Sequence, residues 1–246
     1  MSAQQINILN LYPRQMNMYG DSGNVQVLSQ RSTWRGIETN IINFNPGDTA
    51  EKLEGVDLII GGGGQDSGQL VVQEDLKRIA AELRQLIDDD APALVICGTY
   101  QLFGNYFKTF EGREVRGIGI FDLYTQGYEE RMIGNTVISS SSFGELIGYE
   151  NHSGKTYLGE GLEPLGLVVS GCGNNGEDGT EGARYRNALG TYLHGPLLPK
   201  NPQIADSLIA AALARQAGSA VEAVELAPLP DTWVEPAREV AKSRPR

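Results

Sequence analysis

Strand-like and helix-like segments alternate over the first hundred residues, and this alternation constrains the fold more than any other feature. The pattern predicts strands at residues 6–12, 38–45, 56–63 and 92–97, separated by helices at residues 20–36 and 70–90. The last strand, "PALVIC", is apolar at almost every position, as expected when both faces of a parallel sheet are covered. The sequence therefore predicts an α/β fold, with a mostly parallel sheet and helices on both faces.

Both predicted helices carry local signals. Asp21 and Ser22 stand at the start of the first helix and are typical capping residues. In the second helix, apolar residues follow at spacings of four and three, which places them on one stripe: Val72, Leu76, Ile79, Leu83 and Leu86.

Beyond about residue 110 the pattern changes to short β-like pieces separated by glycine turns. A final helix is predicted at 202–218. No linker divides the chain before that point, so we expect residues 1–218 to form a single domain. The tail at 219–246 is rich in proline and charge, and we interpret it as a C-terminal arm or flexible end.

The overall charge argues against several classes of partner. The chain has 20 Lys and Arg against 31 Asp and Glu, a net charge of −11, which disfavours nucleic acid and anionic lipid. No apolar run is long enough for a membrane span, and the first residues lack the pattern of a signal peptide. Two cysteines among 246 residues favour a reducing compartment. We therefore expect a cytoplasmic protein that does not bind nucleic acid.

Cys97 is the first candidate for chemistry, because it ends an apolar strand and is followed at once by Gly98 in "LVICGTYQLFG". A strand that turns sharply through glycine into a helix can present a nucleophile, and the amide groups of the first helical turn can favour a thiolate. The competing interpretation is a small, inert, buried cysteine. Cys172, in the glycine-rich "SGCGNNGEDG", lacks this strand-then-glycine arrangement.

A thiolate nucleophile needs a base, and the chain offers only His152 and His194. His194 stands at the end of a strand-like run before Gly195, where sites form in α/β sheets. His152 lies in a polar turn and is expected to be a solvated side chain. The cysteines and histidines show no paired metal-ligand spacing, so we expect no metal site.

Two further features could complete a site. Four glycines at 61–64 follow a predicted strand; they match no phosphate-loop pattern, and they could be a flexible turn or bring backbone N–H groups close to a ligand. Arg131, in "GYEERMIGN", is either a surface charge or a clamp for a carboxylate.

Together these motifs resemble the class I, triad-type glutamine amidotransferases, in their cobyric-acid-synthase-like (CobB/CobQ-type) branch. "LVICGTYQLFG" resembles the nucleophile turn of that family, and "YENHSGKTYLG" and "ALGTYLHGPLLPKNP" resemble a conserved turn and the histidine motif. The similarity extends over residues 6–215 and implies a flavodoxin-like class I amidotransferase fold. The segments "LYPRQMNMYGDSGNV", "GGGGQDSGQ" and "GYEERMIGN" further resemble glutaminase subunits that assist a Mur-ligase-like enzyme in amidating lipid II.

The resemblance implies a role for each matched residue. Cys97 would attack the side-chain amide of L-glutamine to form a thioester, and His194 would be its base and then its acid. Arg131 would bind the α-carboxylate of glutamine, and the oxyanion hole would use Gly63, Gly64 and Gly98. Ammonia would pass to a Mur-ligase-like catalytic subunit of the MurT type in a heterodimer at the inner face of the membrane. ATP and Mg²⁺ are expected on that subunit, with no cofactor in this chain, which lacks a Walker A pattern.

One position departs from the commoner family pattern. Many class I amidotransferases have a glutamate two residues after the histidine, where this chain has Pro196. We therefore expect an acid on the partner chain to complete the triad. Three alternative functions remain open: a glutaminase that supplies corrinoid side-chain amidation, a hydrolase of another amide, and an inactive binding module on the same fold.

Overall fold

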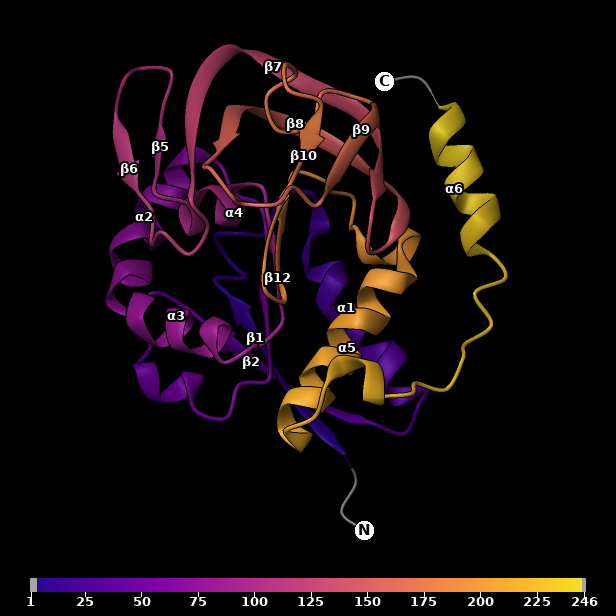
Figure 1. Ribbon diagram of the computed structural model, residues 1–246. Coiled ribbons are helices and arrows are strands. Elements are labelled where there is room, and N and C mark those ends of the chain that lie inside the picture. Colours follow the sequence, from indigo (N-terminus) through magenta and orange to yellow (C-terminus); the bar gives the residue numbers. More distant parts are fainter. Residues whose placement is uncertain (1–3, 245–246) are drawn as a thin grey trace.

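The computed structural model describes residues 4–244 and is built around a six-stranded sheet (Figure 1). The strand order is β11-β12-β4-β3-β1-β2, and all neighbours are parallel except the edge pair β11 and β12. The strands are β1 (Gln5–Leu11), β2 (Glu38–Phe44), β3 (Leu58–Gly61), β4 (Ala93–Ile96), β11 (Ala183–Tyr185) and β12 (Ala188–Thr191). The structure confirms the predicted α/β fold with a mostly parallel sheet.

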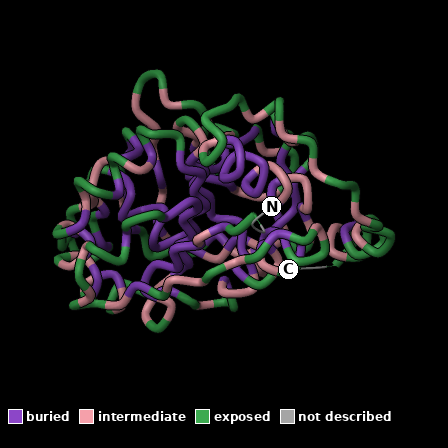
Figure 2. Tube along the Cα trace, turned by 90° about the horizontal axis from the view of Figure 1, so that it is seen from below, coloured by how far each residue is buried: buried purple, intermediate pink, exposed green. Residues whose placement is uncertain are grey.

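Helices cover both faces of this sheet. Figure 1 shows α2 (Asp66–Arg78) and α3 (Ala80–Asp88) on one side, and α1 (Ser22–Thr33) and α5 (Pro202–Ala217) on the other. The helix predicted at 70–90 is thus two helices, because Ile79 has a non-helical backbone (φ −107°, ψ 13°). The apolar stripe continues through this break, since Val72, Leu76 and Leu83 are all buried. Figure 2 shows that buried residues concentrate in the interior of the molecule, while exposed residues lie around its periphery.

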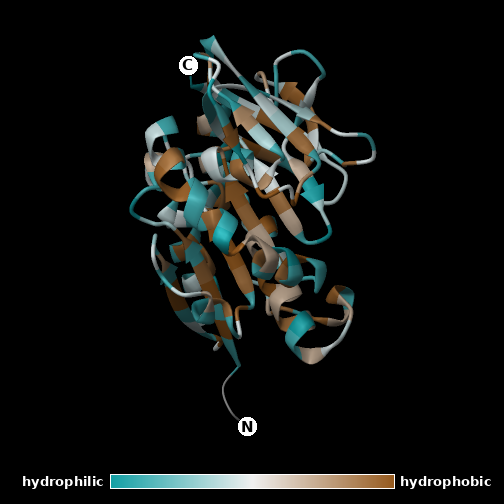
Figure 3. Ribbon diagram, turned by 90° about the vertical axis from the view of Figure 1, so that its left-hand side faces the viewer, coloured by the Kyte–Doolittle hydropathy of each residue, from teal (hydrophilic) through white to brown (hydrophobic). Residues whose placement is uncertain are grey.

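A second sheet lies across the carboxyl-terminal edge of the first, as Figures 1 and 3 show from two directions. Its centre is a long antiparallel hairpin of β7 (Leu123–Ser140) and β8 (Gly144–Leu158). It is completed by β5 (Tyr106–Lys108), β6 (Glu114–Arg116), β9 (Gly166–Ser170) and β10 (Thr180–Glu181). Several of the short β-like pieces predicted beyond residue 110 are therefore joined into single long strands. The glycines that we interpreted as turns between them lie within these strands.

The C-terminal segment contains structure that the sequence did not predict. After α5, the chain forms a helix, α6 (Val234–Ser243), which packs against β7, β8 and the short helix η3 (Leu198–Lys200). Arg238 of α6 is buried and donates hydrogen bonds to the Lys200 carbonyl oxygen (3.0 Å) and the Glu145 carboxylate (2.9 Å). The proline and charged residues of the tail masked the helical pattern of α6 in the sequence. Within residues 4–244, no helix is both long and apolar enough to cross a membrane.

Candidate active site

The site forms where four parallel strands of the first sheet end. Asp21 lies beyond the end of β1, Gly63 beyond β3, Cys97 directly after β4, and His194 beyond β12. Because these strands run in the same direction, their carboxyl ends meet at one edge of the sheet, where sites of α/β proteins form. The chain thus gathers residues that are far apart in sequence.

Cys97 occupies a sharp turn between β4 and the short helix α4 (Gly98–Phe103). Its φ of 48° and ψ of −106° lie outside the conformations that L-residues ordinarily adopt, so the turn is strained. The Cys97 N–H donates to the Thr191 carbonyl oxygen (2.8 Å), which ties the turn to β12. A strained turn that projects a cysteine at the sheet edge is the arrangement of a nucleophile rather than of an inert core residue.

His194 is fully buried and held by its backbone. Its N–H donates to the Tyr149 carbonyl oxygen (2.9 Å), and the Tyr149 N–H donates back (3.3 Å), so β8 of the second sheet pins it. Gly195 follows with a φ of +101°, a conformation that favours glycine and turns the chain away. The ring of Tyr19 packs edge-on against the imidazole, with the centroids 4.8 Å apart.

Asp21 supplies the acid that the sequence interpretation could not place. Its buried carboxylate lies 3.3 Å from Nδ1 of His194 through both oxygens, and it accepts the Gly63 N–H at 2.7 Å. The expectation that this acid comes from a partner chain is therefore corrected: it reaches His194 from a different strand end, not from the position of Pro196. Our interpretation of Asp21 as a helix cap is also wrong, since its side chain makes no cap hydrogen bond.

The second imidazole nitrogen is left for Cys97. Nε2 of His194 is buried, and apart from the Cys97 side chain it has no hydrogen-bond partner among residues 4–244. A Cβ placed on Gly63 would lie 2.7 Å from Cε1 of His194 and 3.3 Å from Cβ of Cys97, so only a glycine fits between the two side chains. Burial lowers the pKa of His194, but the negative charges of Cys97 and Asp21 outweigh it and raise the pKa to about 10. His194 is therefore held in its protonated form beside Cys97.

The glycine loop lies close to Cys97, but one of its backbone N–H groups is already occupied. The Gly63 N–H binds Asp21, so its expected role in an oxyanion hole is not supported. A Cβ on Gly98 would lie 3.0 Å from the Gly64 nitrogen, which places these two residues against each other beside Cys97. Gly64 and Gly98 remain the candidates to stabilise an oxyanion.

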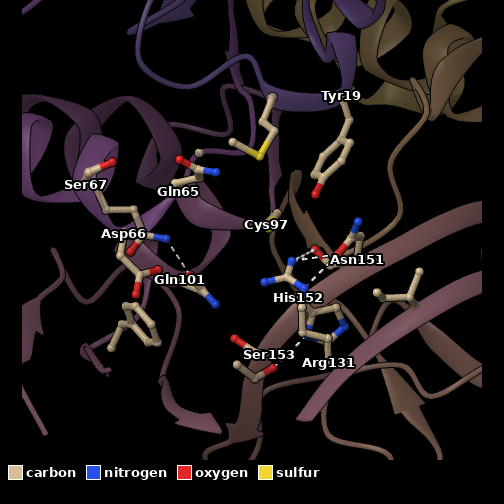
Figure 4. Close-up of a pocket in the computed structure, with 16 residues that line it drawn as sticks. Tyr19, Gln65, Asp66, Ser67, Cys97, Gln101, Arg131, Asn151, His152 and Ser153 are labelled. Carbon is tan, nitrogen blue, oxygen red and sulfur yellow. Dashed lines mark hydrogen bonds between the residues drawn. The ribbon is translucent and has the colours of Figure 1, made fainter. Parts of the chain in front are cut away.

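A cavity of about 570 Å³ opens in front of Cys97 and brings Arg131 into the site (Figure 4). The pairing of β7 and β8 shifts register between Gly127 and Met132, and Arg131 stands in this bulge. Bulges re-aim side chains beside active sites. Asn151 accepts hydrogen bonds from Nε (3.1 Å) and Nη2 (2.6 Å) of Arg131, so the guanidinium is held at the cavity wall. Arg131 therefore lines the same cavity as Cys97 and is not a surface charge remote from the site.

The other candidates have structural environments. His152 is buried in β8, contrary to the solvated turn that we expected: its Nδ1 lies 2.7 Å from the Gly154 carbonyl oxygen, and its ring stacks on Tyr192 at 3.6 Å. Burial lowers the pKa of His152 to about 3, so it is neutral at pH 7. Cys172 lies in a loop, and its backbone N–H donates a hydrogen bond to the buried Glu150 carboxylate (2.8 Å).

The fold and the site are those of an α/β protein with a candidate cysteine nucleophile, and comparison with known proteins identifies its family. Residues 7–202 match the CobB/CobQ-like glutamine amidotransferase domain. Two solved structures share the fold: a glutamine amidotransferase (TM-score 0.58, 16% identity, 83% of this chain and 98% of that one) and a glutamine amidotransferase from Thermotoga maritima (TM-score 0.53, 13% identity, 96% and 92%). The chain belongs to the CobB/CobQ-like glutamine amidotransferase family.

Curated relatives give a finer comparison. The GatD subunit of lipid II isoglutaminyl synthase (glutamine-hydrolyzing) from Staphylococcus aureus (strain N315) is 41% identical over 217 residues, which cover 86% of each chain. The subunit of the same name from Streptococcus pneumoniae (strain ATCC BAA-255 / R6) is 36% identical, covering 89% of this chain and 84% of that one. A probable cobyric acid synthase from Methanothermobacter thermautotrophicus is 31% identical, but the match covers only 60% of this chain and 32% of that one.

Proposed function

We propose that this chain is the glutaminase subunit of a lipid II isoglutaminyl synthase. The observation that carries the proposal is the match to two GatD subunits over more than four fifths of their length. The match to the cobyric acid synthase covers only about a third of that protein's length. The strained Cys97 turn beside His194 and Asp21 supports a working enzyme over an inactive binding module.

The arrangement of the site supports a reaction through a thioester on Cys97. The Cys97 thiolate attacks the side-chain carbonyl carbon of L-glutamine, and the resulting oxyanion accepts hydrogen bonds from the Gly64 and Gly98 N–H groups. The His194 imidazolium gives its proton to the leaving nitrogen, so the carbon–nitrogen bond breaks and ammonia departs. A γ-glutamyl thioester remains on Cys97. His194, now neutral, takes a proton from water, whose oxygen attacks the thioester and releases glutamate and the thiolate.

Asp21 would position the His194 imidazole for these steps. Its carboxylate would accept a hydrogen bond from the protonated Nδ1 of His194, which leaves Nε2 for Cys97, and its charge would stabilise the imidazolium. Arg131, which lines the cavity, would bind the α-carboxylate of glutamine there.

The ammonia would be used by a Mur-ligase-like subunit of the MurT type. In this proposal the partner binds ATP and Mg²⁺, activates the D-glutamate α-carboxylate of the lipid II stem peptide, and forms the D-isoglutamine amide at the inner face of the membrane. Direct transfer between subunits fits the chemistry, because ammonia released into neutral water is mostly ammonium and is not nucleophilic.

A nitrogen-transfer experiment tests the proposal. The chain is combined with a Mur-ligase-like protein from the same genome, lipid II, ATP, Mg²⁺ and glutamine labelled with heavy nitrogen in its side-chain amide. We expect the label in the stem-peptide amide by mass spectrometry. Cys97→Ala should abolish this transfer, while added ammonium chloride should restore unlabelled amidation. Amidation of a corrinoid and not of lipid II, or unimpaired transfer with Cys97→Ala, would contradict the proposal.

A further inference from the structure

The cavity wall opposite Arg131 contains a buried acceptor with nothing to bind. Gln69, in the first turn of α2, is 1% exposed and lines the cavity. Its Oε1 is buried and accepts no hydrogen bond from any residue between 4 and 244. An unpaired buried amide oxygen costs free energy, so such an atom beside a nucleophile indicates a ligand group that pairs with it.

A series of hydrogen bonds fixes the direction of this acceptor. Nε2 of Gln69 donates to Oε1 of Gln101 (2.6 Å), and Nε2 of Gln101 donates to the Tyr192 hydroxyl (3.0 Å). The Tyr192 hydroxyl in turn lies 2.6 Å from the Thr156 hydroxyl. Because the amide nitrogen of Gln69 is engaged by this series, its oxygen is the atom left for the cavity. A Cβ on Gly98 would lie 2.9 Å from Nε2 of Gln69, so the group also stands directly beside the Cys97 turn.

A carboxylate accompanies this acceptor. Asp66, the first residue of α2, lines the same cavity, and Figure 4 shows it on the wall opposite Arg131 and Asn151. Partial desolvation raises the pKa of Asp66, although its side chain is still exposed to solvent, while the Arg131 guanidinium acts in the opposite direction, so the two charges interact across the cavity. The two walls therefore differ in character: one offers a cation, and the other offers a carboxylate and a neutral acceptor.

We propose that the first turn of α2 binds the α-ammonium group of glutamine, with Oε1 of Gln69 and the carboxylate of Asp66 as its acceptors. This inference rests on the proposed glutaminase function. An ammonium group has three N–H donors and no acceptor, so it requires acceptors such as these, whereas the α-carboxylate requires the donors of Arg131. The site thereby selects free glutamine by both charges, and it disfavours a glutamine whose nitrogen is acylated.

Labelling of Cys97 tests this without requiring turnover or a partner. The full chain is treated with a diazo-ketone analogue of L-glutamine and with the same analogue lacking the α-amino group, and the rate of adduct formation at Cys97 is followed by mass spectrometry. We expect the complete analogue to react about 10- to 100-fold faster at low concentration, since hydrogen bonds to charged groups are strong. Gln69→Met should remove most of that difference by slowing the complete analogue alone. Asp66→Asn should have the same direction of effect but a smaller size, because Asp66 is exposed.

Matched controls separate binding from folding. Glu74→Gln removes one negative charge from the exposed face of the same helix and should change neither rate. Alkylation of Cys97 by iodoacetamide should be equal in all variants if the nucleophile turn is intact.

Three results would overturn the inference in distinguishable ways. If Gln69→Met slows both analogues equally, Gln69 acts on the reacting amide or on the fold and not on the ammonium group. If the wild type labels with both analogues at the same rate, there is no ammonium site, although the proposed glutaminase could stand. If neither analogue labels the wild type while iodoacetamide does, the proposed function itself fails.

Discussion

Replacing Asp21 with asparagine should disable the base while preserving the shape of the site. Asp21 serves two donors, the Gly63 N–H at 2.7 Å and Nδ1 of His194 at 3.3 Å. An asparagine has only one acceptor oxygen. The short bond to a buried backbone N–H should retain that oxygen, which turns the amide NH₂ group toward Nδ1. His194 would then carry its proton on Nε2, the nitrogen that must accept the thiol proton.

The expected loss can be estimated from this tautomer change. In serine hydrolases, the equivalent change in the triad aspartate lowers kcat by about 10,000-fold. The contacts between Asp21 and His194 are longer than an ideal hydrogen bond, so we expect a smaller loss in kcat of about 100- to 1,000-fold, with little change in KM.

Two measurements check this prediction. The first is steady-state hydrolysis of glutamine. The second is the rate of iodoacetamide alkylation of Cys97 against pH, with the modified cysteine identified by peptide mapping. Because Asp21 contributes to the raised pKa of His194, its loss should deplete the imidazolium near neutral pH. The alkylation rate of the wild type should vary little with pH near neutrality. In that pH range the Asp21→Asn variant should be alkylated more slowly than the wild type.

Asp57 offers a matched control. It is also buried and accepts a backbone N–H, that of Asn7 at 2.8 Å, but it lies at the amino end of β3, away from the site. Asp57→Asn should affect stability and not kcat. Wild-type kcat and an unchanged alkylation profile in Asp21→Asn would contradict a role of Asp21 in positioning His194 and leave Asp21 as a structural partner of Gly63.

Three further outcomes are expected. Arg131→Ala should raise KM for glutamine about 10- to 100-fold with a smaller effect on kcat, and an unchanged KM in steady-state assays would remove Arg131 from the substrate site. Burial raises the pKa of Glu181 to about 7, so its contribution to the free energy of unfolding is present below pH 4.5 and lost as the pH rises through about 7. Glu181→Gln should therefore gain stability relative to wild type between pH 5 and pH 8, by at most about 3 kcal/mol in urea titrations, and a pH-independent difference would contradict this. Since the chain itself contains Asp21, the isolated chain should hydrolyse glutamine at a measurable rate, and strict dependence on a partner would show that the acid contact alone is insufficient.

The parallel core was predictable because its signals are local. The strand that ends at Ile96 is a continuous apolar run, and the helix stripe from Val72 to Leu83 has helical spacing. Both patterns follow from which faces are buried, and periodicity reports that directly. The break at Ile79 could not be predicted in the same way, because no glycine or proline marks it.

The site was only partly predictable, because half of it depends on which strands become neighbours. Cys97 and His194 each end a strand-like run, which is a local signal. Asp21 looked like a helix cap, and only the sheet order brings β1, β3, β4 and β12 to one edge and its carboxylate to His194. The position of Asp21 in the connection between the first strand and the first helix was the available signal. Gln69 gave none, since its importance rests on an oxygen left unpaired by tertiary packing.

The central claim, that Cys97 carries the glutamyl group, is tested most directly by the mass of the chain during turnover. The chain is mixed with glutamine, quenched in acid within the first turnovers, and the peptide containing Cys97 is analysed by mass spectrometry. We expect a γ-glutamyl adduct on Cys97 that forms with glutamine and is absent with glutamate. Steady glutamine hydrolysis by a Cys97→Ala variant, or a glutamyl adduct found on Cys172 in place of Cys97, would contradict it.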